Sequence, residues 1–356
     1  MNTYSPLNEK IRILGRTVKK DPLPLFWTGS GVELLLNGST LTFVLEADHS
    51  VYEEWIRVEV DDFTMIRMPL NKGETKVTVY RGLNPEETKR VQLFKEVQAM
   101  PEDPEAKLIL KAIETDGELF SLPEKEMKIE FIGDSLTSGE GLAGNIRLND
   151  WVSCVFSTKD SFSQLIAKEM NAEVRVISQS GWGAYCSWDY KTENALPLYY
   201  EKVCGVLKGG QNEALGALKN HDFSEWQPDF IFVNLGSNDK SGMLKDPENV
   251  PKAFKKAVYD FLLMLRRNNP AAEIIWACGL GKNELFGQAE AAIQEFSAAN
   301  NDTKVHLLVL PGLSDFDLHE LSEMLGSRNH PGPKANRCQA DYIENMIRKI
   351  KEEKDV

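Results

Sequence analysis

The sequence predicts a two-part fold: an antiparallel β-sandwich, followed by an α/β domain whose parallel sheet is covered by helices. Short apolar runs that suit strands follow one another up to about residue 122, without a convincing helix between them. After Leu122-Pro123, apolar strands alternate with segments of helical period, which is typical of a parallel sheet. We therefore expect a jelly-roll-like sandwich over residues 1–122 and an α/β domain over residues 123–356.

The first part carries the signals of short strands joined by tight turns. Asn37-Gly38 lies between two apolar runs and is the strongest short signal for a β-hairpin. Asp61-Asp62 and Asn71-Lys72-Gly73 indicate two further turns. The expected strands are Glu33–Leu36, Thr40–Ala47, Trp55–Val60, Phe63–Leu70, Thr75–Tyr80, Arg90–Val97 and Lys107–Ile113.

The second part changes to alternating strand and helix patterns. Apolar residues at helical spacing predict helices over Ser161–Met170, around Phe254–Leu265, around Ala289–Phe296 and around Tyr342–Ile350. Continuous apolar runs predict the buried strands Met127–Ile132, Val174–Ile177, Asp229–Leu235, Glu273–Ala277 and Val305–Leu310. The long stretches 138–160 and 182–226 are weakly patterned and rich in Gly, Trp and Tyr. Loops of that length in a compact domain are usually functional.

Composition and charge exclude several classes of protein. The chain has 356 residues, of which 42% are hydrophobic and 27% charged, so it is neither disordered nor fibrous. A net charge of −13 argues against nucleic-acid and membrane partners and favours a neutral substrate. Five scattered cysteines without a Cys-x-x-Cys pair indicate neither a disulfide framework nor a zinc site. No secretory signal or transmembrane run is apparent, so we expect a cytoplasmic protein with reduced thiols.

Three polar blocks follow strands of the predicted parallel sheet, where ligands of such sheets bind. After the first strand, Gly133-Asp134-Ser135 places a serine hydroxyl and its N–H at the start of a helical turn. After the next strand, Gly181 allows a backbone N–H to approach a ligand closely. After the third, the Asn238 amide is placed to donate to an oxyanion. Taken alone, the serine block is equally well explained as a helix cap, whereas the Gly181 block is more often a plain turn and the Asn238 block more often a turn or cap.

Among the five histidines, His330 is the best candidate for a general base. It stands in Asn329-His330-Pro331-Gly332, on a loop just before the last predicted helix. His319 is the reserve candidate, and the remaining three histidines have no suggestive context.

Taken in order, these blocks resemble the GDSL, or SGNH, hydrolase superfamily, whose catalytic serine, glycine, asparagine and histidine occupy corresponding blocks. The resemblance covers roughly residues 125–350 and implies a three-layer, flavodoxin-like domain. Together with the preceding sandwich and Trp27-Thr28-Gly29-Ser30, the domain order resembles family 2 carbohydrate esterases. Members of that family remove acetyl groups from plant polysaccharides, such as xylan and mannan.

The resemblance implies a role for each residue. Ser135 would be the nucleophile and His330 its base, while the oxyanion would be held by the N–H groups of Ser135 and Gly181 and the amide of Asn238. No cofactor and no metal would be needed.

The sequence departs from the superfamily at one position. Many members have an aspartate two or three residues before the histidine, where this chain has Arg328 and Ser327. A backbone carbonyl or the Ser327 hydroxyl would then orient the imidazole and make a Ser–His dyad. A more distant carboxylate, Glu323 or Asp317, is the other possibility. Without an orienting carboxylate, we expect a lower rate, since such a group stabilises the imidazolium.

The expected substrate is a small acyl group on a hydrophilic alcohol, such as an acetylated oligosaccharide. Trp182 follows the oxyanion glycine, and Trp151 and Trp188 lie in the flanking loops, where indole faces would stack on sugar rings. Core packing is the competing explanation for each indole. We expect a monomer or a homodimer. The alternatives are a lysophospholipase or thioesterase on the same frame, or a carbohydrate-binding protein with an inactive hydrolase domain.

Overall fold

The computed structural model of the chain describes residues 1–312, 315 and 321–354. These residues form two compact units. The first contains Met1–Glu124, Val152–Thr158 and Lys202–His221, and the second contains Lys125–Trp151, Lys159–Glu201 and Asp222–Val356. The boundary expected after residue 122 lies close to the first division, but it does not foresee the two later segments that join the first unit.

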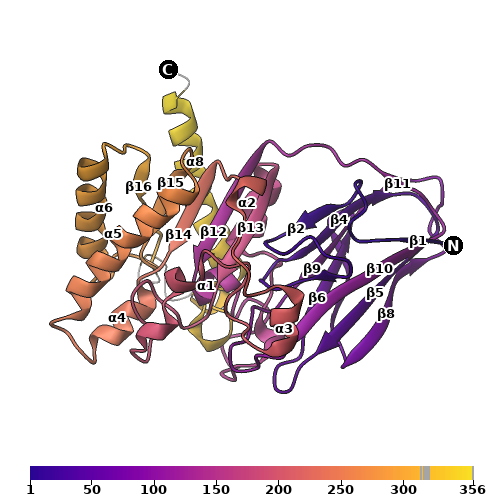
Figure 1. The fold of residues 1–356 in the computed structure, drawn as a ribbon, viewed down its shortest axis with the longest axis horizontal. Coiled ribbons are helices and arrows are strands. Elements are labelled where there is room, and N and C mark those ends of the chain that lie inside the picture. Colours follow the sequence, from indigo (N-terminus) through magenta and orange to yellow (C-terminus); the bar gives the residue numbers. More distant parts are fainter. Residues whose placement is uncertain (313–314, 316–320, 355–356) are drawn as a thin grey trace. The chain divides into compact units, whose positions relative to one another are not determined.

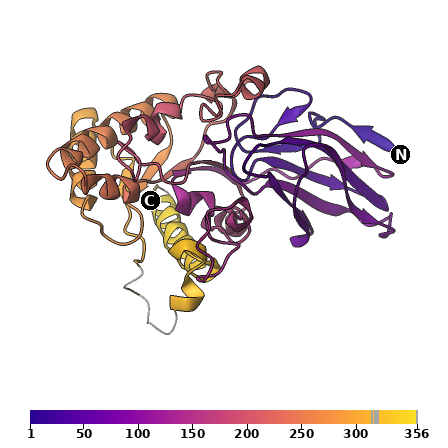
Figure 2. The same cartoon turned by 90° about the horizontal axis from the view of Figure 1, so that it is seen from below.

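The first unit is built from two antiparallel sheets (Figures 1 and 2). One has the order β1 (Asn2–Tyr4), β10 (Lys107–Thr115), β5 (Thr40–Asp48), β8 (Gly73–Arg81), with β3 (Leu23–Pro24) also on β10. The other has the order β11 (Leu119–Phe120), β4 (Gly31–Leu36), β9 (Lys89–Lys95), β6 (Trp55–Val60), β7 (Phe63–Pro69), with β2 (Arg12–Leu14) on β4.

Both sheets contribute to a single hydrophobic core, so the first unit is a β-sandwich. Phe43 and Leu110 from one sheet and Leu34 and Leu93 from the other belong to the same fully buried cluster. Alternate residues of each strand point inward because successive side chains of a strand face opposite sides. The sandwich predicted from the strand spacing is therefore confirmed.

The hairpin expected at Asn37-Gly38 is wrong. The strands on either side of it, β4 and β5, belong to different sheets and do not pair with each other. Gly38 does adopt a positive φ of 102°, as the signal requires, but its turn carries the chain across the sandwich. The turn packs on Gly117, where an added Cβ would lie 2.0 Å from the Asn37 carbonyl oxygen. The Asn-Gly signal depends on local backbone preference alone. Which strands pair is determined by the burial of their side chains in the core.

Hydrogen bonds explain why two later segments belong to the first unit. The carboxylate of Glu96, at the end of β9, accepts bonds from the Thr158 N–H and the Ser157 hydroxyl, each at 2.9 Å. In the other segment, Asn212 of helix α3 (Gly210–Leu215) donates to the Ala106 carbonyl at 2.9 Å. Parts of both predicted functional loops therefore serve the sandwich.

The second unit contains a five-stranded parallel sheet (Figure 1). Its order is β13 (Ala172–Ser178), β12 (Met127–Gly133), β14 (Phe230–Asn234), β15 (Glu273–Ala277), β16 (Val305–Leu307). Numbered along the unit this is 2-1-3-4-5, the order of flavodoxin-like sheets. The predicted strands are all present, although the last is shorter than expected.

Helices cover both faces of this sheet. On one face, α2 (Phe162–Glu169) and α8 (Pro333–Lys354) share a core with strand residues such as Phe131 and Ile275. On the other, Phe261 of α5 (Val250–Asn268) meets Trp276 edge to face, with ring centroids 6.2 Å apart. Helix α6 (Phe286–Asn300) lies beside α5 (Figure 1). The shorter helices are α1 (Ser135–Ser138), α4 (Ser237–Met243), α7 (Leu321–Met324) and the 3₁₀ turns Ser153–Val155, Thr192–Asn194, Leu196–Tyr199, Phe223–Glu225 and Ser327–Asn329.

Candidate active site

The three polar blocks predicted from the sequence follow three adjacent strands at one edge of the parallel sheet. β12 lies between β13 and β14, and Gly133 at its end is in register with Ser178 and with Asn234. Because the strands are parallel, the residues that follow each of them emerge on the same side. The register therefore places Ser135, Gly181 and Asn238 at the same end of the sheet.

Ser135 is the first residue of the four-residue helix α1. The N–H of a first helical residue has no acceptor within its own helix, so it remains available to bind a developing negative charge. The cap is Asp134, whose carboxylate accepts a bond from the Leu136 N–H at 3.0 Å. Gly133 is required in front of it, since an added Cβ would lie 2.1 Å from the Thr137 hydroxyl oxygen.

His330 reaches Ser135 from the loop before α8. Its Nε2 lies 2.8 Å from the Ser135 Oγ, and its Nδ1 lies 3.1 Å from the Arg328 carbonyl oxygen. Because a carbonyl oxygen can only accept, Nδ1 must carry the hydrogen, which leaves the Nε2 lone pair directed at the serine hydroxyl. This is the arrangement in which an imidazole acts as a base toward a serine.

The backbone that supplies this carbonyl has an unusual conformation. Arg328 has φ 55° and ψ 30°, and Asn329 also has a positive φ. A residue with a Cβ pays about 1–2 kcal/mol to adopt the left-handed region. The turn is held by backbone bonds, since the Arg328 N–H donates to the Leu148 carbonyl at 3.1 Å and the Ser327 N–H to the Gly141 carbonyl at 3.0 Å. The structure thus has a main-chain carbonyl where many relatives of this pattern have an aspartate.

The Asn238 amide connects the blocks that follow β12 and β13. Its Nδ2 donates to the Asp134 carboxylate at 3.1 Å and to the Trp182 carbonyl at 2.9 Å. Both amide hydrogens therefore have acceptors within the protein. To hold an oxyanion, Asn238 would share one of these hydrogens between two acceptors or exchange one acceptor for the substrate.

Gly181 has a positive φ of 78°, a conformation that favours glycine. Its carbonyl accepts a bond from the Trp188 N–H at 2.9 Å. An added Cβ would lie 2.9 Å from Cδ1 of the Trp188 indole. Both the backbone angle and the neighbouring ring therefore exclude a larger residue here.

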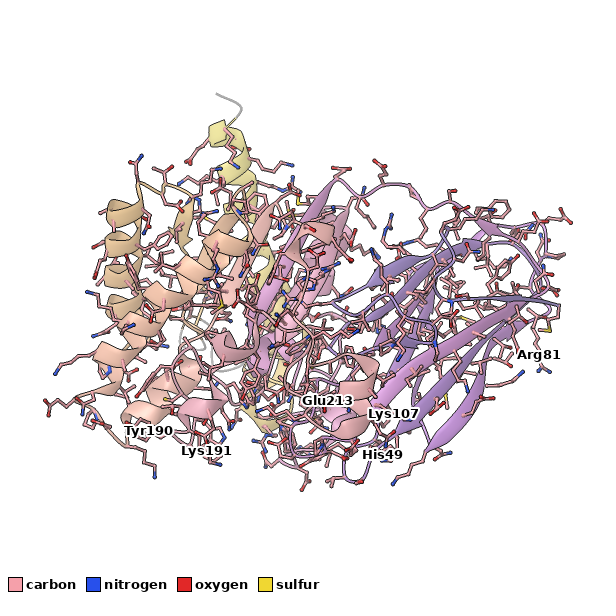
Figure 3. All side chains as sticks on the ribbon, in the orientation of Figure 1. His49, Arg81, Lys107, Tyr190, Lys191 and Glu213 are labelled. Atoms are coloured by element: carbon pink, nitrogen blue, oxygen red, sulfur yellow. The ribbon has the colours of Figure 1, made fainter. Side chains whose placement is uncertain are left out.

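Asp239 holds the chain that follows Gly181. Its carboxylate accepts three backbone bonds of 2.7–3.0 Å, from the N–H groups of Ala184, Tyr185 and Cys186. Burial raises the pKa of Asp239, an effect that these three bonds oppose. Tyr190 lies further along the same loop (Figure 3). Its hydroxyl donates to the Asp246 carboxylate, just beyond α4, at 3.2 Å.

Asp134 is a buried acid beside the nucleophile. Its pKa is raised to about 7, chiefly by burial; the hydrogen bond from the Leu136 N–H lowers the pKa, and the nearby carboxylates of Asp239 and Glu140 add to the increase. Its charge therefore changes near neutral pH, within contact of the Asn238 amide.

Comparison with known proteins agrees with this geometry. Residues 129–343 match the model of the GDSL-like lipase/acylhydrolase family, which is more than half of the chain. The chain belongs to this family. The esterase class expected from the sequence is thereby confirmed, as is the fold of its second domain.

The similarity to known proteins covers both units of the chain. An acetyl xylan esterase from the rumen bacterium Butyrivibrio proteoclasticus shares 36% identity, with a TM-score of 0.92 over 98% of this chain and 99% of that one. An acetylxylan esterase/glucomannan deacetylase of Cellvibrio japonicus is 26% identical over 93% of this chain and 84% of its own length. A family two carbohydrate esterase from Clostridium thermocellum, at 23% identity and a TM-score of 0.80 over 95% of this chain and 98% of that one, has the same fold.

The three tryptophans that were predicted to stack on a sugar differ in how much of their surface is exposed. Trp182 is 5% exposed, and its indole packs on Tyr199 with centroids 4.9 Å apart, which leaves little ring surface for a sugar. Trp151 is half-buried. Trp188 is 62% exposed and contacts Gly181, so the predicted stacking on a sugar is better assigned to Trp188 than to Trp182.

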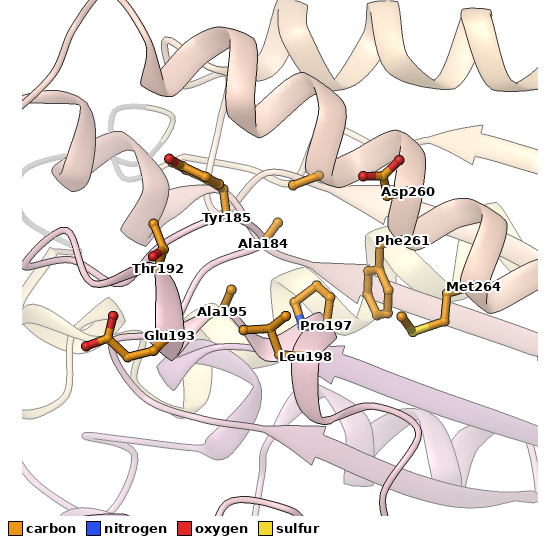
Figure 4. A pocket seen from close by; sticks show the side chains of 11 residues that line it. Ala184, Tyr185, Thr192, Glu193, Ala195, Pro197, Leu198, Asp260, Phe261 and Met264 are labelled. Atoms are coloured by element: carbon orange, nitrogen blue, oxygen red, sulfur yellow. The ribbon is translucent and has the colours of Figure 1, made fainter.

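A cavity of about 510 Å³ lies between the loop after Gly181 and helix α5 (Figure 4). It is mainly apolar, and none of Ser135, Gly181, Asn238 and His330 lines it. Its lining residues are Ala184, Tyr185, Thr192, Glu193, Ala195, Pro197, Leu198, Ala257, Asp260, Phe261 and Met264.

Several sequence-based candidates have other places in the structure. Glu323 pairs with Lys334 at 3.2 Å. His319 and Asp317 lie outside the described residues. Within the described part of the chain, no group of three or more metal-ligating side chains is found, and no helix is long and apolar enough to cross a membrane.

Sequence reasoning missed Asp239 and Glu140. Asp239 directly follows Asn238, so it lies within a block that the sequence analysis had selected. Its role could not be predicted, because the three N–H groups that it binds lie more than fifty residues away in the sequence. Glu140 carried no signal, because its importance depends on Arg328, 188 residues along the chain.

Proposed function

We propose that this protein is a serine esterase that removes O-acetyl groups from hemicellulose-derived oligosaccharides, from xylan or mannan. The observation that carries the proposal is the 2.8 Å contact between the His330 Nε2 and the Ser135 Oγ at the carboxyl edge of the sheet. The substrate class is supported by the 36% identical relative, described as an acetyl xylan esterase, which matches over 98% of this chain.

The first half of the proposed reaction forms an acetyl-enzyme. The Ser135 Oγ attacks the acetyl carbonyl carbon while the His330 Nε2 takes the hydroxyl proton. The N–H groups of Ser135 and Gly181 and the Asn238 amide receive the oxyanion, and each such donor is worth about 2.7–4 kcal/mol in the transition state. The bond between the carbonyl carbon and the sugar oxygen then breaks, and the Nε2 proton passes to that oxygen.

The second half releases acetate. A water molecule attacks the acetyl carbon and gives its proton to the His330 Nε2. The bond to the Ser135 Oγ breaks, and the proton returns from Nε2 to that oxygen. The Arg328 carbonyl keeps the Nδ1 hydrogen in place throughout, so the lone pair of Nε2 always faces the reacting oxygen.

The main test is acetate release from acetylated xylan and glucomannan oligosaccharides, read by NMR at each ring position. We expect the wild-type protein to release acetate and both Ser135→Ala and His330→Ala to be nearly inactive. Activity of Ser135→Ala equal to that of the wild type would refute the assignment of the nucleophile. His319→Ala should remain active, and the reverse result would move the base to that residue.

Acyl-chain preference distinguishes this function from a lysophospholipase or thioesterase. Acetyl, butyryl and octanoyl nitrophenyl esters form a suitable panel, and we expect turnover to fall along that series. Faster turnover of the octanoyl ester would favour the alternative. If sugar binds while no ester is cleaved, the protein is a carbohydrate-binding protein instead.

The cytoplasmic location, the lack of nucleic-acid and membrane partners, and a monomeric or homodimeric state also remain proposals. They fit a substrate of imported oligosaccharides and a net charge of −13. Cell fractionation and light scattering would test the location and the oligomeric state.

A further inference from the structure

Glu140 is a buried carboxylate that the serine–histidine chemistry leaves without a role. Its side chain is 3% exposed, yet it lies five residues after the nucleophile. Its Oε1 is 3.0 Å from the Arg328 Nε and 3.8 Å from the His330 Nε2. Buried carboxylates are costly unless they are paired, and this one is paired with the residue whose carbonyl orients the base.

The position of the Arg328 carbonyl depends on an unfavourable backbone conformation. At φ 55°, Arg328 is in the left-handed region, which residues with a Cβ rarely adopt. Strain of this kind persists where surrounding contacts hold it. The Arg328 side chain supplies one such contact by donating from Nε to Glu140, in addition to the backbone bond to Leu148.

The loops of the nucleophile and the base are also in direct contact at Gly141, the residue after Glu140. A Cβ added to Gly141 would lie 2.5 Å from the Ser327 carbonyl oxygen and 2.8 Å from the His330 Cβ. The backbone next to Glu140 therefore contacts the turn that carries the base, in addition to the contact of the Glu140 side chain with Arg328.

Charge gives Glu140 a second effect. The acceptor at Nδ1 is a neutral carbonyl, so it offers little compensation when His330 takes the serine proton and becomes an imidazolium. That proton arrives at Nε2, 3.8 Å from the Glu140 carboxylate. An opposite charge at this distance in a partly buried site favours the imidazolium.

We propose that Glu140 is a positioning residue for the base and takes the place of the aspartate that is absent before His330. It acts by holding Arg328 so that its carbonyl meets Nδ1, and by placing a negative charge near Nε2. The inference rests on the proposed serine esterase mechanism, but not on the identity of the sugar substrate.

The test compares Glu140→Gln, Arg328→Gln and the double variant, with 4-nitrophenyl acetate as substrate. Glu140→Gln keeps the size of the side chain and removes its charge, while Arg328→Gln breaks the same contact from the more exposed partner. We expect each to lower kcat by up to about 100-fold, the scale on which a misplacement of about 1 Å acts, with KM nearly unchanged. The double variant should lose about as much as Glu140→Gln alone, because Arg328 has no Glu140 carboxylate to hold once that charge is gone.

The matched control is Glu169→Gln, which breaks the ion pair with Arg337, 3.2 Å long, on the surface of α2 and α8. It should keep wild-type kcat. The rate at which a fluorophosphonate labels Ser135 should fall in Glu140→Gln and Arg328→Gln, because this reaction also needs the base. Thermal unfolding of each variant distinguishes lost positioning from lost fold.

Three results would overturn the inference: a Glu140→Gln kcat within twofold of wild type, losses that multiply in the double variant, or a loss confined to KM. If Glu140→Gln does not fold, Arg328→Gln alone decides. A wild-type protein that cleaves 4-nitrophenyl acetate but not acetylated oligosaccharides would refute the proposed substrate and leave this inference standing. A wild-type protein that neither cleaves the ester nor takes the label would overturn both.

Discussion

Asn238 and Asp134 show how single residues join separate parts of the chain into one site. The Asn238 amide bonds to the residue before the nucleophile and to the residue after Gly181. Asp134 in turn caps the helix that begins at Ser135. A change at either residue therefore alters both the geometry of the nucleophile and the donors around it.

Replacing Asn238 by Ala should reduce kcat/KM for an acetyl ester by roughly 100- to 1000-fold, the usual effect of losing an oxyanion donor. The measurement is steady-state kinetics with 4-nitrophenyl acetate. Asn249→Ala is the matched control, because Asn249 is exposed, its side-chain amide donates to Asp246 outside the site, and it should be replaceable without loss of activity. Loss of less than fivefold in Asn238→Ala would remove this residue from the oxyanion site.

The raised pKa of Asp134, about 7, predicts a pH-dependent stability. The unfolded chain releases this proton near pH 4, whereas the folded protein holds it up to about pH 7. Its contribution to stability is therefore complete below about pH 4 and is lost as the pH rises through about 7. Between about pH 5 and pH 8, the free energy of unfolding of the wild type should fall relative to that of Asp134→Asn. Urea denaturation at each pH measures both free energies of unfolding. If their difference stays constant over this pH range, the raised pKa of Asp134 is contradicted.

At the scale of elements, the site is made by loops at one edge of the sheet and not by the strands themselves. Asp239 holds the loop after β13, and the loop of α1 packs against the turn before α8 at Gly141. The strands fix where each loop starts, and these contacts decide where it goes.

Gly141→Ala should separate the nucleophile from the base. Its φ of 82° and the 2.8 Å approach of an added Cβ to the His330 Cβ both require a shift of backbone. We expect a clear loss of kcat, measured with the acetyl ester. Gly287→Ala is the control, because Gly287 lies in α6 with nothing within 4 Å of an added Cβ and alanine favours helices. Equal activity of the two variants would show that the contact at Gly141 is unimportant.

At the scale of the whole molecule, the two units are not two continuous stretches of the chain. Val152–Thr158 lies within the stretch predicted as the second domain, residues 123–356, yet it belongs to the first unit through Glu96. Burial raises the pKa of Glu96, but the charge of Arg57 and the bonds from Thr158 and Ser157 outweigh that effect and leave its pKa lowered. The sandwich therefore depends on a buried carboxylate and on a segment supplied from elsewhere.

Glu96→Ala should destabilise the protein by about 3–5 kcal/mol, because it leaves the buried Arg57 without this partner. Urea denaturation measures the loss. Glu114→Ala removes a half-buried carboxylate that pairs with the exposed Lys76, and it should cost only about 0–1 kcal/mol. Similar losses for the two variants would show that the Glu96 network does not hold the segment.

Sequence reasoning predicted the strands, the parallel sheet and the two-unit order because these depend on local period. It also selected Ser135 and His330, which the structure places in contact. It failed at Asn37-Gly38, where a correct local turn joins strands of different sheets. The orienting carbonyl of Arg328 was foreseen only as one of several groups, since a left-handed arginine has no sequence signal.

The sequence by itself determined which residues emerge at the carboxyl edge of the sheet, because hydrophobic period sets the strands and parallel strands end together. Only the tertiary structure decided how those residues meet. The contact of Glu140 with Arg328, and of Glu96 with Thr158, joins positions far apart in the chain. Such contacts depend on the paths of the loops and on which side chains are buried next to them. The spacing of residues in the sequence predicts neither.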